Sequence, residues 1–170
     1  RALSGDPIAA FGCIVAVNTV IDLRTAQEID KTHFDAIVAE DFSPEALVLL
    51  GRKKGLRLLA VRPDLSGLAV PYMDMRRIRG GLLMQTSDTF SVAEFNPCPV
   101  SKRKPTGEEM RDLAFAWRVV KHIKSNAIVL VKDATLLGMG AGQPSRVVSV
   151  ELALKKAGPM AKGSVLGSDA

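Results

Sequence analysis

The part of this sequence with the clearest potential for ligand binding is the glycine-rich segment 137–146, which reads LGMGAGQPSR. Its three glycines would let the backbone turn tightly and approach a ligand without a clash from Cβ atoms. Pro144 suits the first turn of a helix, so we expect a helix over 144–157. The free N–H groups and the positive end of the helix dipole would then face a ligand, and Arg146 would add a cation. The segment therefore indicates a site for an anionic or phosphate-bearing ligand.

This pattern is not specific, because it matches neither of the common phosphate-binding motifs. Its spacing differs from GxGxxG, and no Lys-Ser or Lys-Thr pair follows the glycines as it does in a Walker A loop. A tight turn between a strand and a helix, with a surface arginine, accounts for the same residues. On the pattern alone both interpretations remain open.

The elements before this segment begin with an alternation of strands and helices. Short apolar runs predict buried strands at about 12–17, 35–39 and 57–61. Asp22 is an N-cap candidate for a helix through about Lys31, and Ser43 for a helix through about Lys54. A β-α-β-α-β order predicts parallel strands covered by helices.

The rest of the chain is expected to hold a connection and a second α/β part. We expect a first lobe part over about 1–62, a connecting segment over 63–105 and a second lobe part over 106–170. In the connection, two strand pieces surround Gly80-Gly81, and prolines near residue 97 act as breakers. Thr106 and Glu109 form a capping box that opens the longest helix, expected over 106–124. Further strands are expected at 126–131, at 136–139 as a continuation or hairpin partner, and at 163–167.

Composition narrows the class of protein. With 170 residues, 47% apolar and 24% charged, the chain is typical of a globular domain, and no apolar run is long enough for a membrane span. The net charge is +5, but aromatics make up only 5% and lie away from the basic clusters, so nucleic-acid binding is not expected. Cys13 and Cys98 have no metal-ligand spacing, which argues against a cysteine zinc site and favours a reducing, cytoplasmic setting. Because the chain starts at Arg1 and stops abruptly at Ala170, we expect a piece of a longer protein, truncated at both ends.

Several segments, taken together and in order, resemble one enzyme family. They are 6–12 (DPIAAFG), 79–85 (RGGLLMQ), 112–117 (DLAFAW), 121–129 (KHIKSNAIV), 138–146 (GMGAGQPSR) and 163–170 (GSVLGSDA). They resemble the bifunctional purine-biosynthesis enzymes that combine AICAR transformylase with IMP cyclohydrolase. The resemblance covers the middle of the transformylase half. It implies transfer of a formyl group from 10-formyltetrahydrofolate to the amino group of AICAR, in a homodimer.

The resemblance also implies a fold and a metal content. The implied fold is α/β and cytidine-deaminase-like, a layered fold with a mixed, largely parallel sheet. The deaminase zinc is not expected, because the sequence has neither H-x-E nor P-C-x-x-C. A monovalent cation, potassium, is implied instead, and its matching neighbourhood contains Ser125 and Asp169, whose oxygen atoms suit a hard ion.

Four residues match family positions that contact AICAR: Gly12, Asp35, Asn126 and Arg146. A glycine permits close approach of the backbone, a carboxylate accepts hydrogen bonds from amino groups, and an amide can orient the reacting amine. Val147 matches a position close to the folate. Without the resemblance, Gly12 and Asn126 would be interpreted as turn residues and Asp35 as an ordinary residue at the start of a strand.

No catalytic residue is expected in the chain itself. Lys121-His122 looks like the catalytic lysine-histidine pair of the family. In the family, however, the catalytic pair belongs to a different motif, which is expected upstream of Arg1. We expect Lys121-His122 inside the long helix as a packed or solvated pair, and we expect the fragment alone to be inactive. The alternatives are a non-catalytic module that binds a nucleotide or phosphate, and a regulatory or assembly domain.

Overall fold

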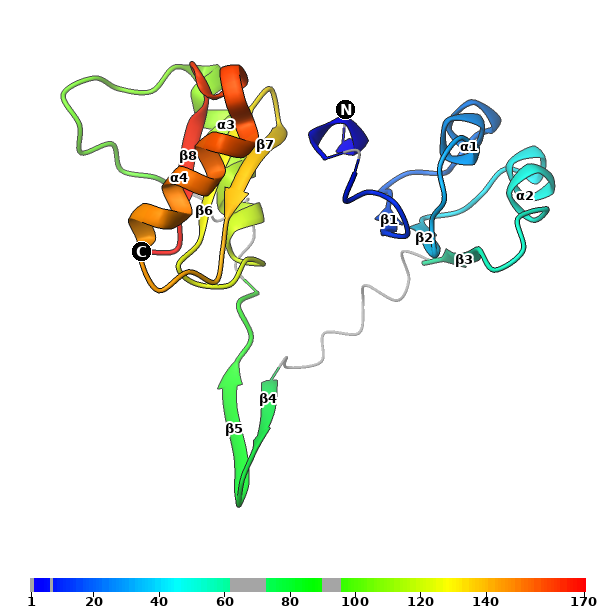
Figure 1. Cartoon of the computed structure of the whole chain (residues 1–170), viewed down its shortest axis with the longest axis horizontal. Coiled ribbons are helices and arrows are strands. Elements are labelled where there is room, and N and C mark those ends of the chain that lie inside the picture. Colours follow the sequence, from blue (N-terminus) through cyan, green and yellow to red (C-terminus); the bar gives the residue numbers. More distant parts are fainter. Residues whose placement is uncertain (1, 7, 62–72, 90–95) are drawn as a thin grey trace. The chain divides into compact units, whose positions relative to one another are not determined.

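The computed structural model describes residues 2–6, 8–61, 73–89 and 96–170. These residues form two compact units (Figure 1): Asp6–Thr86, and a second unit that joins the N-terminal residues up to Gly5 to Ser87–Ala170. The second unit begins with a short 3-10 helix, η1 (Ala2–Gly5). The expected connecting segment lies in part outside the described residues, at 62–72 and 90–95.

The first unit contains a parallel sheet of three strands in the order β1-β2-β3 (Figure 1). Its elements are β1 (Ile14–Ala16), α1 (Leu23–Asp30), β2 (Ala36–Ala39), α2 (Pro44–Leu50) and β3 (Arg57–Ala60). The register places Ile37 between Val15 and Leu58, and the side chain of Ile37 is fully buried. The predicted β-α-β-α-β order with parallel strands is confirmed.

The two helices of this unit begin where the sequence predicts. The Asp22 carboxylate accepts a hydrogen bond from the Thr25 N–H at 2.8 Å, and the Ser43 hydroxyl accepts one from Ala46 at 3.2 Å. The expected end of the second helix near Lys54 is wrong, because α2 stops at Leu50. After Leu50 the chain tightens into shorter-range turns, and the Lys53 amino group bonds to main-chain carbonyls at the end of α1.

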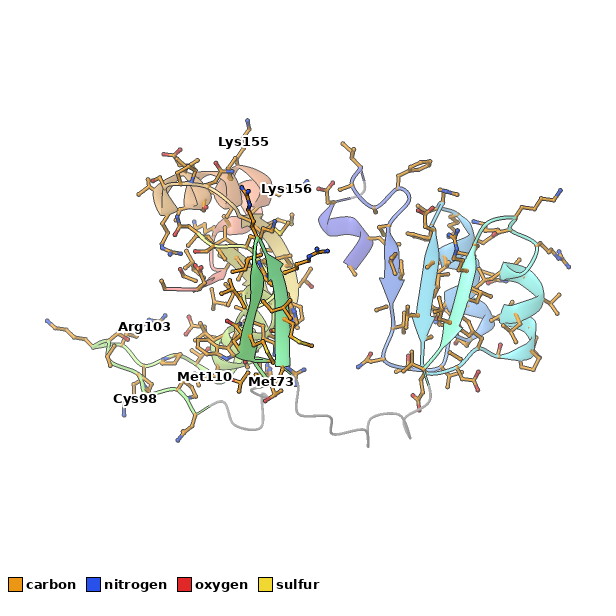
Figure 2. The ribbon with its side chains drawn as sticks, turned by 90° about the horizontal axis from the view of Figure 1, so that it is seen from below. Met73, Cys98, Arg103, Met110, Lys155 and Lys156 are labelled. Carbon is orange, nitrogen blue, oxygen red and sulfur yellow. The ribbon has the colours of Figure 1, made fainter. Side chains whose placement is uncertain are left out.

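A separate two-stranded hairpin follows, formed by β4 (Met73–Ile78) and β5 (Gly81–Thr86). The two strands are antiparallel, and Gly80 supplies the positive φ of +85° that the tight turn requires. The prediction of two strand pieces around Gly80-Gly81 is confirmed. Every residue of both strands is exposed, with Met73 at the open end of the ribbon (Figure 2).

The second unit is a three-layer sandwich around an antiparallel sheet in the order β7-β6-β8. The strands are β6 (Ile128–Lys132), β7 (Thr135–Gly140) and β8 (Val165–Ser168); the helices are α3 (Gly107–Val120), α4 (Arg146–Ala157) and the short 3-10 helix η4 (Gly158–Ala161). Side chains of β6 alternate between the layers. Val129 and Val131 pack with Ala116 of α3, whereas Ile128 and Leu130 pack with α4.

The described sheets together contain both parallel and antiparallel pairings, as expected of a mixed arrangement, but the pairings are not largely parallel. Among the described strands, two pairings are parallel and three are antiparallel. A two-residue turn at Asp133 and Ala134 joins β6 to β7, and such a short connection allows only antiparallel pairing. Both turn residues have positive φ, and the Asp112 carboxylate of α3 accepts hydrogen bonds from their N–H groups at 3.0 and 2.8 Å.

The long helix α3 begins as predicted and ends earlier. The capping box is present: Thr106 accepts from the Glu109 N–H at 3.2 Å, and the Glu109 carboxylate accepts from the Thr106 N–H at 2.8 Å. Arg103, on the extended segment before the helix (Figure 2), donates two hydrogen bonds to the same carboxylate. The prediction that Lys121-His122 lies inside this helix is wrong. The helix ends at Val120 with Lys121 as its C-cap residue, and the Lys121 amino group donates to the Asp88 carbonyl at 3.0 Å.

Candidate functional site

Two of the three glycines in segment 137–146 lie inside strand β7 and not in a loop. Gly138 and Gly140 face helix α4, where a Cβ atom on Gly138 would overlap the Ala153 carbonyl and one on Gly140 the Ser149 carbonyl. Their lack of a side chain lets the helix lie very close to the strand. The expectation of a glycine loop that cradles an anion is therefore wrong for these two residues. Gly142, with φ of +67°, belongs to the turn that follows the strand.

Helix α4 begins at Arg146, with Ser145 as N-cap, and not at Pro144 as expected. Residues 143 and 144 instead direct their main-chain carbonyls at a side chain from another element. The Nδ2 atom of Asn126 donates to the Gln143 carbonyl at 2.8 Å and to the Pro144 carbonyl at 3.2 Å. The turn before α4 therefore fixes which way the Asn126 amide points.

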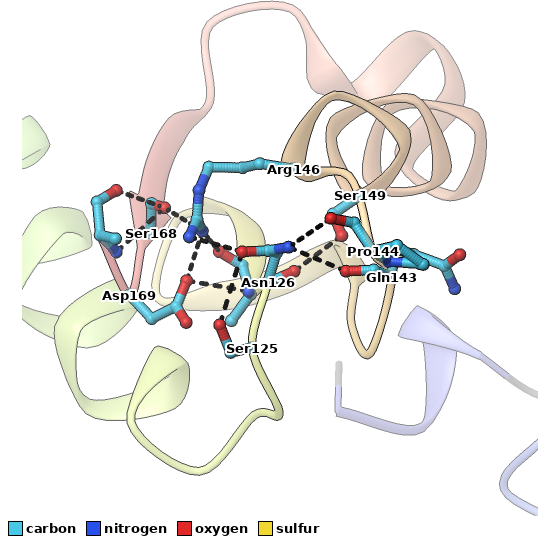
Figure 3. Close-up of polar contacts among 10 residues, drawn as sticks. Ser125, Asn126, Gln143, Pro144, Arg146, Ser149, Ser168 and Asp169 are labelled. Atoms are coloured by element: carbon cyan, nitrogen blue, oxygen red, sulfur yellow. Dashed lines mark hydrogen bonds and ion pairs between the residues drawn. The ribbon is translucent and has the colours of Figure 1, made fainter.

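The guanidinium group of Arg146 lies at the centre of a network of polar side chains (Figure 3). Its Nη2 atom donates to Asn126 Oδ1 at 2.8 Å, and its Nη1 atom donates to Ser168 Oγ at 3.0 Å and to the Asp169 carboxylate. We call this network the Arg146 cluster. Its members are Ser125, Asn126, Arg146, Ser149, Ser168 and Asp169. The Arg146 side chain is 31% exposed, so the network can be reached from solvent.

Asp169 is held as a carboxylate anion within this cluster. Hydrogen bonds from Ser125 and Arg146, with a further one from the Ala127 N–H at 2.9 Å, lower the pKa of Asp169 from 3.8 to about 2. The carboxylate therefore stays ionised at neutral pH and offsets the charge of Arg146. With its charge offset, Arg146 acts in the cluster as an oriented hydrogen-bond donor.

This pKa shift makes the stability of the cluster dependent on pH. Because the folded-state pKa of Asp169 is depressed, its contribution is complete above the unfolded-state value of 3.8 and is lost as the pH falls toward about 2. We expect the midpoint of thermal unfolding of Asp169→Asn to lie below that of the wild type at pH 6, and the difference to shrink between pH 4 and 2. The pKa of Glu109 is also lowered to about 2, but Glu109 titrates in both proteins, so its contribution cancels in the difference between their midpoints. A difference that stays constant down to pH 2 would contradict this account.

Gly12 and Asp35 lie in the other unit, close to each other at the ends where β1 and β2 begin. The Gly12 N–H donates to the His33 carbonyl at 2.9 Å, and the Asp35 N–H donates to the Cys13 carbonyl at 3.2 Å. The His33 ring lies close to both Asp35 and Phe11. Its Nε2 atom is 3.5 Å from Asp35 Oδ1, and its ring centroid is 5.1 Å from that of the Phe11 ring. Gly12 has a φ of +72°, which favours glycine.

The structure therefore gathers the candidate residues into two groups. Ser125, Asn126, Arg146 and Asp169 belong to the Arg146 cluster, whereas Gly12 and Asp35 form the second group. Val147, the first residue after Arg146, is 66% exposed on α4. Three residues were missed by the sequence analysis: His33, Ser149 and Ser168. Each lies one to three residues from a candidate, and the helical spacing of Arg146 and Ser149 was the clearest available signal.

Within the residues that the structure describes, no three His, Cys, Asp or Glu side chains gather in a way that could hold a metal ion. No helix in the same residues is both long and apolar enough to cross a membrane.

The fold and the cluster define an α/β protein with a polar site suited to a small ligand that carries amide or amino groups. The family comparison is more specific. The model of the AICARFT/IMPCHase bienzyme family matches residues 1–156, and the chain belongs to this family.

Full-length relatives agree with this assignment. The chain is 46% identical over all 170 residues to the bifunctional purine biosynthesis protein PurH of Thermoanaerobacter sp. strain X514, and covers 33% of that protein. The PurH proteins of Bacillus cereus and of Desulfitobacterium hafniense strain Y51 give the same identity and coverage. The chain therefore spans about a third of the length of the curated relatives it matches.

Proposed function

We propose that this chain forms part of an AICAR transformylase, which transfers a formyl group from 10-formyltetrahydrofolate to AICAR in purine biosynthesis. In this reaction the AICAR amine attacks the formyl carbon and loses a proton, the bond from that carbon to the folate nitrogen breaks, and the folate nitrogen takes up a proton. The proton acceptor is a histidine from a part of the polypeptide outside this chain. The residues described here bind and orient AICAR.

The pairing of Asn126 with Arg146 is the observation that carries this proposal. Together the two side chains present an amide and a forked guanidinium, which are suited to a carboxamide or an amine on the ligand. Both are held by several partners before any ligand arrives, so little ordering remains to be done on binding. Asn126 orients the reacting amine and Arg146 provides a fixed donor beside it.

Gly12 and Asp35 form a second part of the AICAR site in this proposal. The backbone at Gly12 lies against the base, and the Asp35 carboxylate accepts hydrogen bonds from the amino group. The family assembles as a homodimer, so Asp35 and Arg146 can serve different copies of the site. The two units correspond to two cytidine-deaminase-like lobes, and the protein acts in the cytoplasm.

Val147 and two cluster residues have further proposed roles. Val147 lies beside the folate, where its exposed apolar side chain is suitable. Ser125 and Asp169 supply oxygen atoms of the kind that potassium prefers, and they lie close enough to share a hydrogen bond. Since Asp169 also binds Arg146 and the Ala127 N–H, bound potassium would share this carboxylate, and its remaining ligands would come from other groups. No zinc is expected.

The alternative of a non-catalytic phosphate-binding module has lost its main support. It rested on a glycine loop before a helix, whereas Gly138 and Gly140 lie in β7 against α4. The Arg146 cluster also places a carboxylate beside the arginine, and this favours a neutral or amino-bearing ligand group over a phosphate at that point.

The function is tested by assaying the full-length polypeptide with AICAR and 10-formyltetrahydrofolate. We expect tetrahydrofolate to be released only when AICAR is present, and formylated AICAR to accumulate in equal amount. We expect Asn126→Ala to lower turnover by about tenfold or more, since its amide orients the nucleophile. Arg111→Ala removes an exposed side chain of α3 and should leave turnover unchanged. Equal turnover in Asn126→Ala and the wild type, or no AICAR-dependent release, would overturn the proposal.

A further inference from the structure

Ser149 stands out in the packing of helix α4 against the sheet. It is the buried polar residue of the described core, with a fully inaccessible side chain. It shares a stripe of small residues with Ala153 and Ala157, four and eight positions further along α4, and this stripe lies over Gly138 and Gly140. An alanine would satisfy the same close packing, so steric fit does not explain why residue 149 carries a hydroxyl.

The hydroxyl of Ser149 has one well-defined partner. It donates to the main-chain carbonyl of Asn126 at 2.7 Å (Figure 3). Arg146 lies three residues earlier on α4, and this spacing places the two side chains on the same side of the helix. Helix α4 therefore holds Asn126 at two points, the carbonyl through Ser149 and the side-chain Oδ1 through Arg146.

The remaining contacts of Asn126 complete this arrangement. Its Nδ2 atom donates to two carbonyls in the turn that leads into α4. The amide oxygen faces a donor and the amide nitrogen faces acceptors, so only one orientation of the amide satisfies every partner. Ser149 fixes the backbone from which this amide extends, because it anchors the residue's own carbonyl to the helix.

We propose that Ser149 is a positioning residue for the AICAR-binding amide of Asn126. This inference rests on the proposed function, since Asn126 must contact AICAR for its position to affect binding. Loss of the hydroxyl leaves a partly buried carbonyl without its donor and frees Asn126 to shift relative to Arg146. Ser149 itself touches no ligand and acts through Asn126.

The test compares AICAR affinity with thermal stability in the full-length polypeptide. Ser149→Ala removes the hydrogen bond, and Ser149→Cys keeps a side chain of similar size with a much weaker donor. Val150→Ala is the matched control, because Val150 lies one residue away on α4, packs against the apolar cluster that contains Ile128 and Leu130, and has an apolar side chain that cannot form a hydrogen bond to Asn126. We expect both Ser149 variants to weaken AICAR binding about tenfold. We expect Val150→Ala to lower the midpoint of thermal unfolding at least as much as the Ser149 variants do, while leaving the affinity for AICAR unchanged.

The outcomes separate this inference from the proposed function. If Arg146→Ala weakens AICAR binding but Ser149→Ala and Ser149→Cys behave like Val150→Ala, Ser149 has a packing role only and the inference is wrong. If Arg146→Ala leaves AICAR binding unchanged in a folded protein, the site itself is misplaced and both proposals are overturned. Should Ser149→Ala fail to fold, the Ser149→Cys variant decides the question.

Discussion

Replacement of Arg146 by alanine is expected to weaken AICAR binding by about tenfold to a hundredfold in the full-length polypeptide. A hydrogen bond that involves a charged group contributes roughly 1.5–3 kcal/mol, and this range of free energy corresponds to that loss of affinity. The guanidinium also fixes Asn126 and Asp169, so part of the loss comes from disorder of these neighbours. The dissociation constant, measured by calorimetric titration of AICAR, provides the test.

Two companion variants make this result interpretable. Arg146→Lys keeps the positive charge but loses the planar fork, and we expect it to bind AICAR nearly as weakly as Arg146→Ala. Arg111→Ala removes an arginine that is 74% exposed on α3 and should bind like the wild type. Wild-type affinity in Arg146→Lys would indicate that simple charge attraction suffices. Wild-type affinity in a well-folded Arg146→Ala protein would remove Arg146 from the site.

The largest effect on stability is expected from Gly140→Ala. The new methyl group would overlap backbone atoms of Ser149, and a backbone cannot move aside by changing a rotamer. We expect α4 to be displaced from β7 at a cost of about 3 kcal/mol or more, at the upper end of overpacking effects. The midpoint of thermal unfolding should fall accordingly, and AICAR binding should be lost with the position of Arg146.

The control for this substitution is Gly107→Ala at the first residue of α3. A Cβ atom there meets no heavy atom within 4 Å, and alanine has the higher helix propensity. We expect this variant to be as stable as the wild type or slightly more stable. If Gly140→Ala were as stable as Gly107→Ala, the close approach of α4 to β7 would be wrong.

The sequence predicted the elements whose signals are local. The caps at Asp22, Ser43 and Thr106 depend on a side chain and an N–H group three residues away, so short patterns identify them. Parallel pairing in the first unit followed from the order of strands and helices. Helix ends were less predictable, because at Leu50 and Val120 tertiary contacts of a following lysine accompany the end of the helix.

The glycine segment shows why a local pattern can mislead. Glycines at alternate positions fit a ligand-binding loop and fit equally a strand beneath a closely packed helix. The second arrangement requires small residues on the facing helix, and Ser149, Ala153 and Ala157 provide them at a spacing of four. Reading both segments together would have favoured the strand. The hydrogen bonds of the Arg146 cluster could not be predicted in this way, since β8 and α4 meet only in the folded chain.

The central claim is that Asn126 and Arg146 contact AICAR. A crystal structure of the full-length polypeptide with AICAR bound tests it most directly. The account predicts AICAR atoms within hydrogen-bond distance of Asn126 and of the Arg146 guanidinium, with Ser149 still donating to the Asn126 carbonyl. AICAR bound elsewhere, with the Arg146 cluster unchanged and without ligand contact, would contradict it.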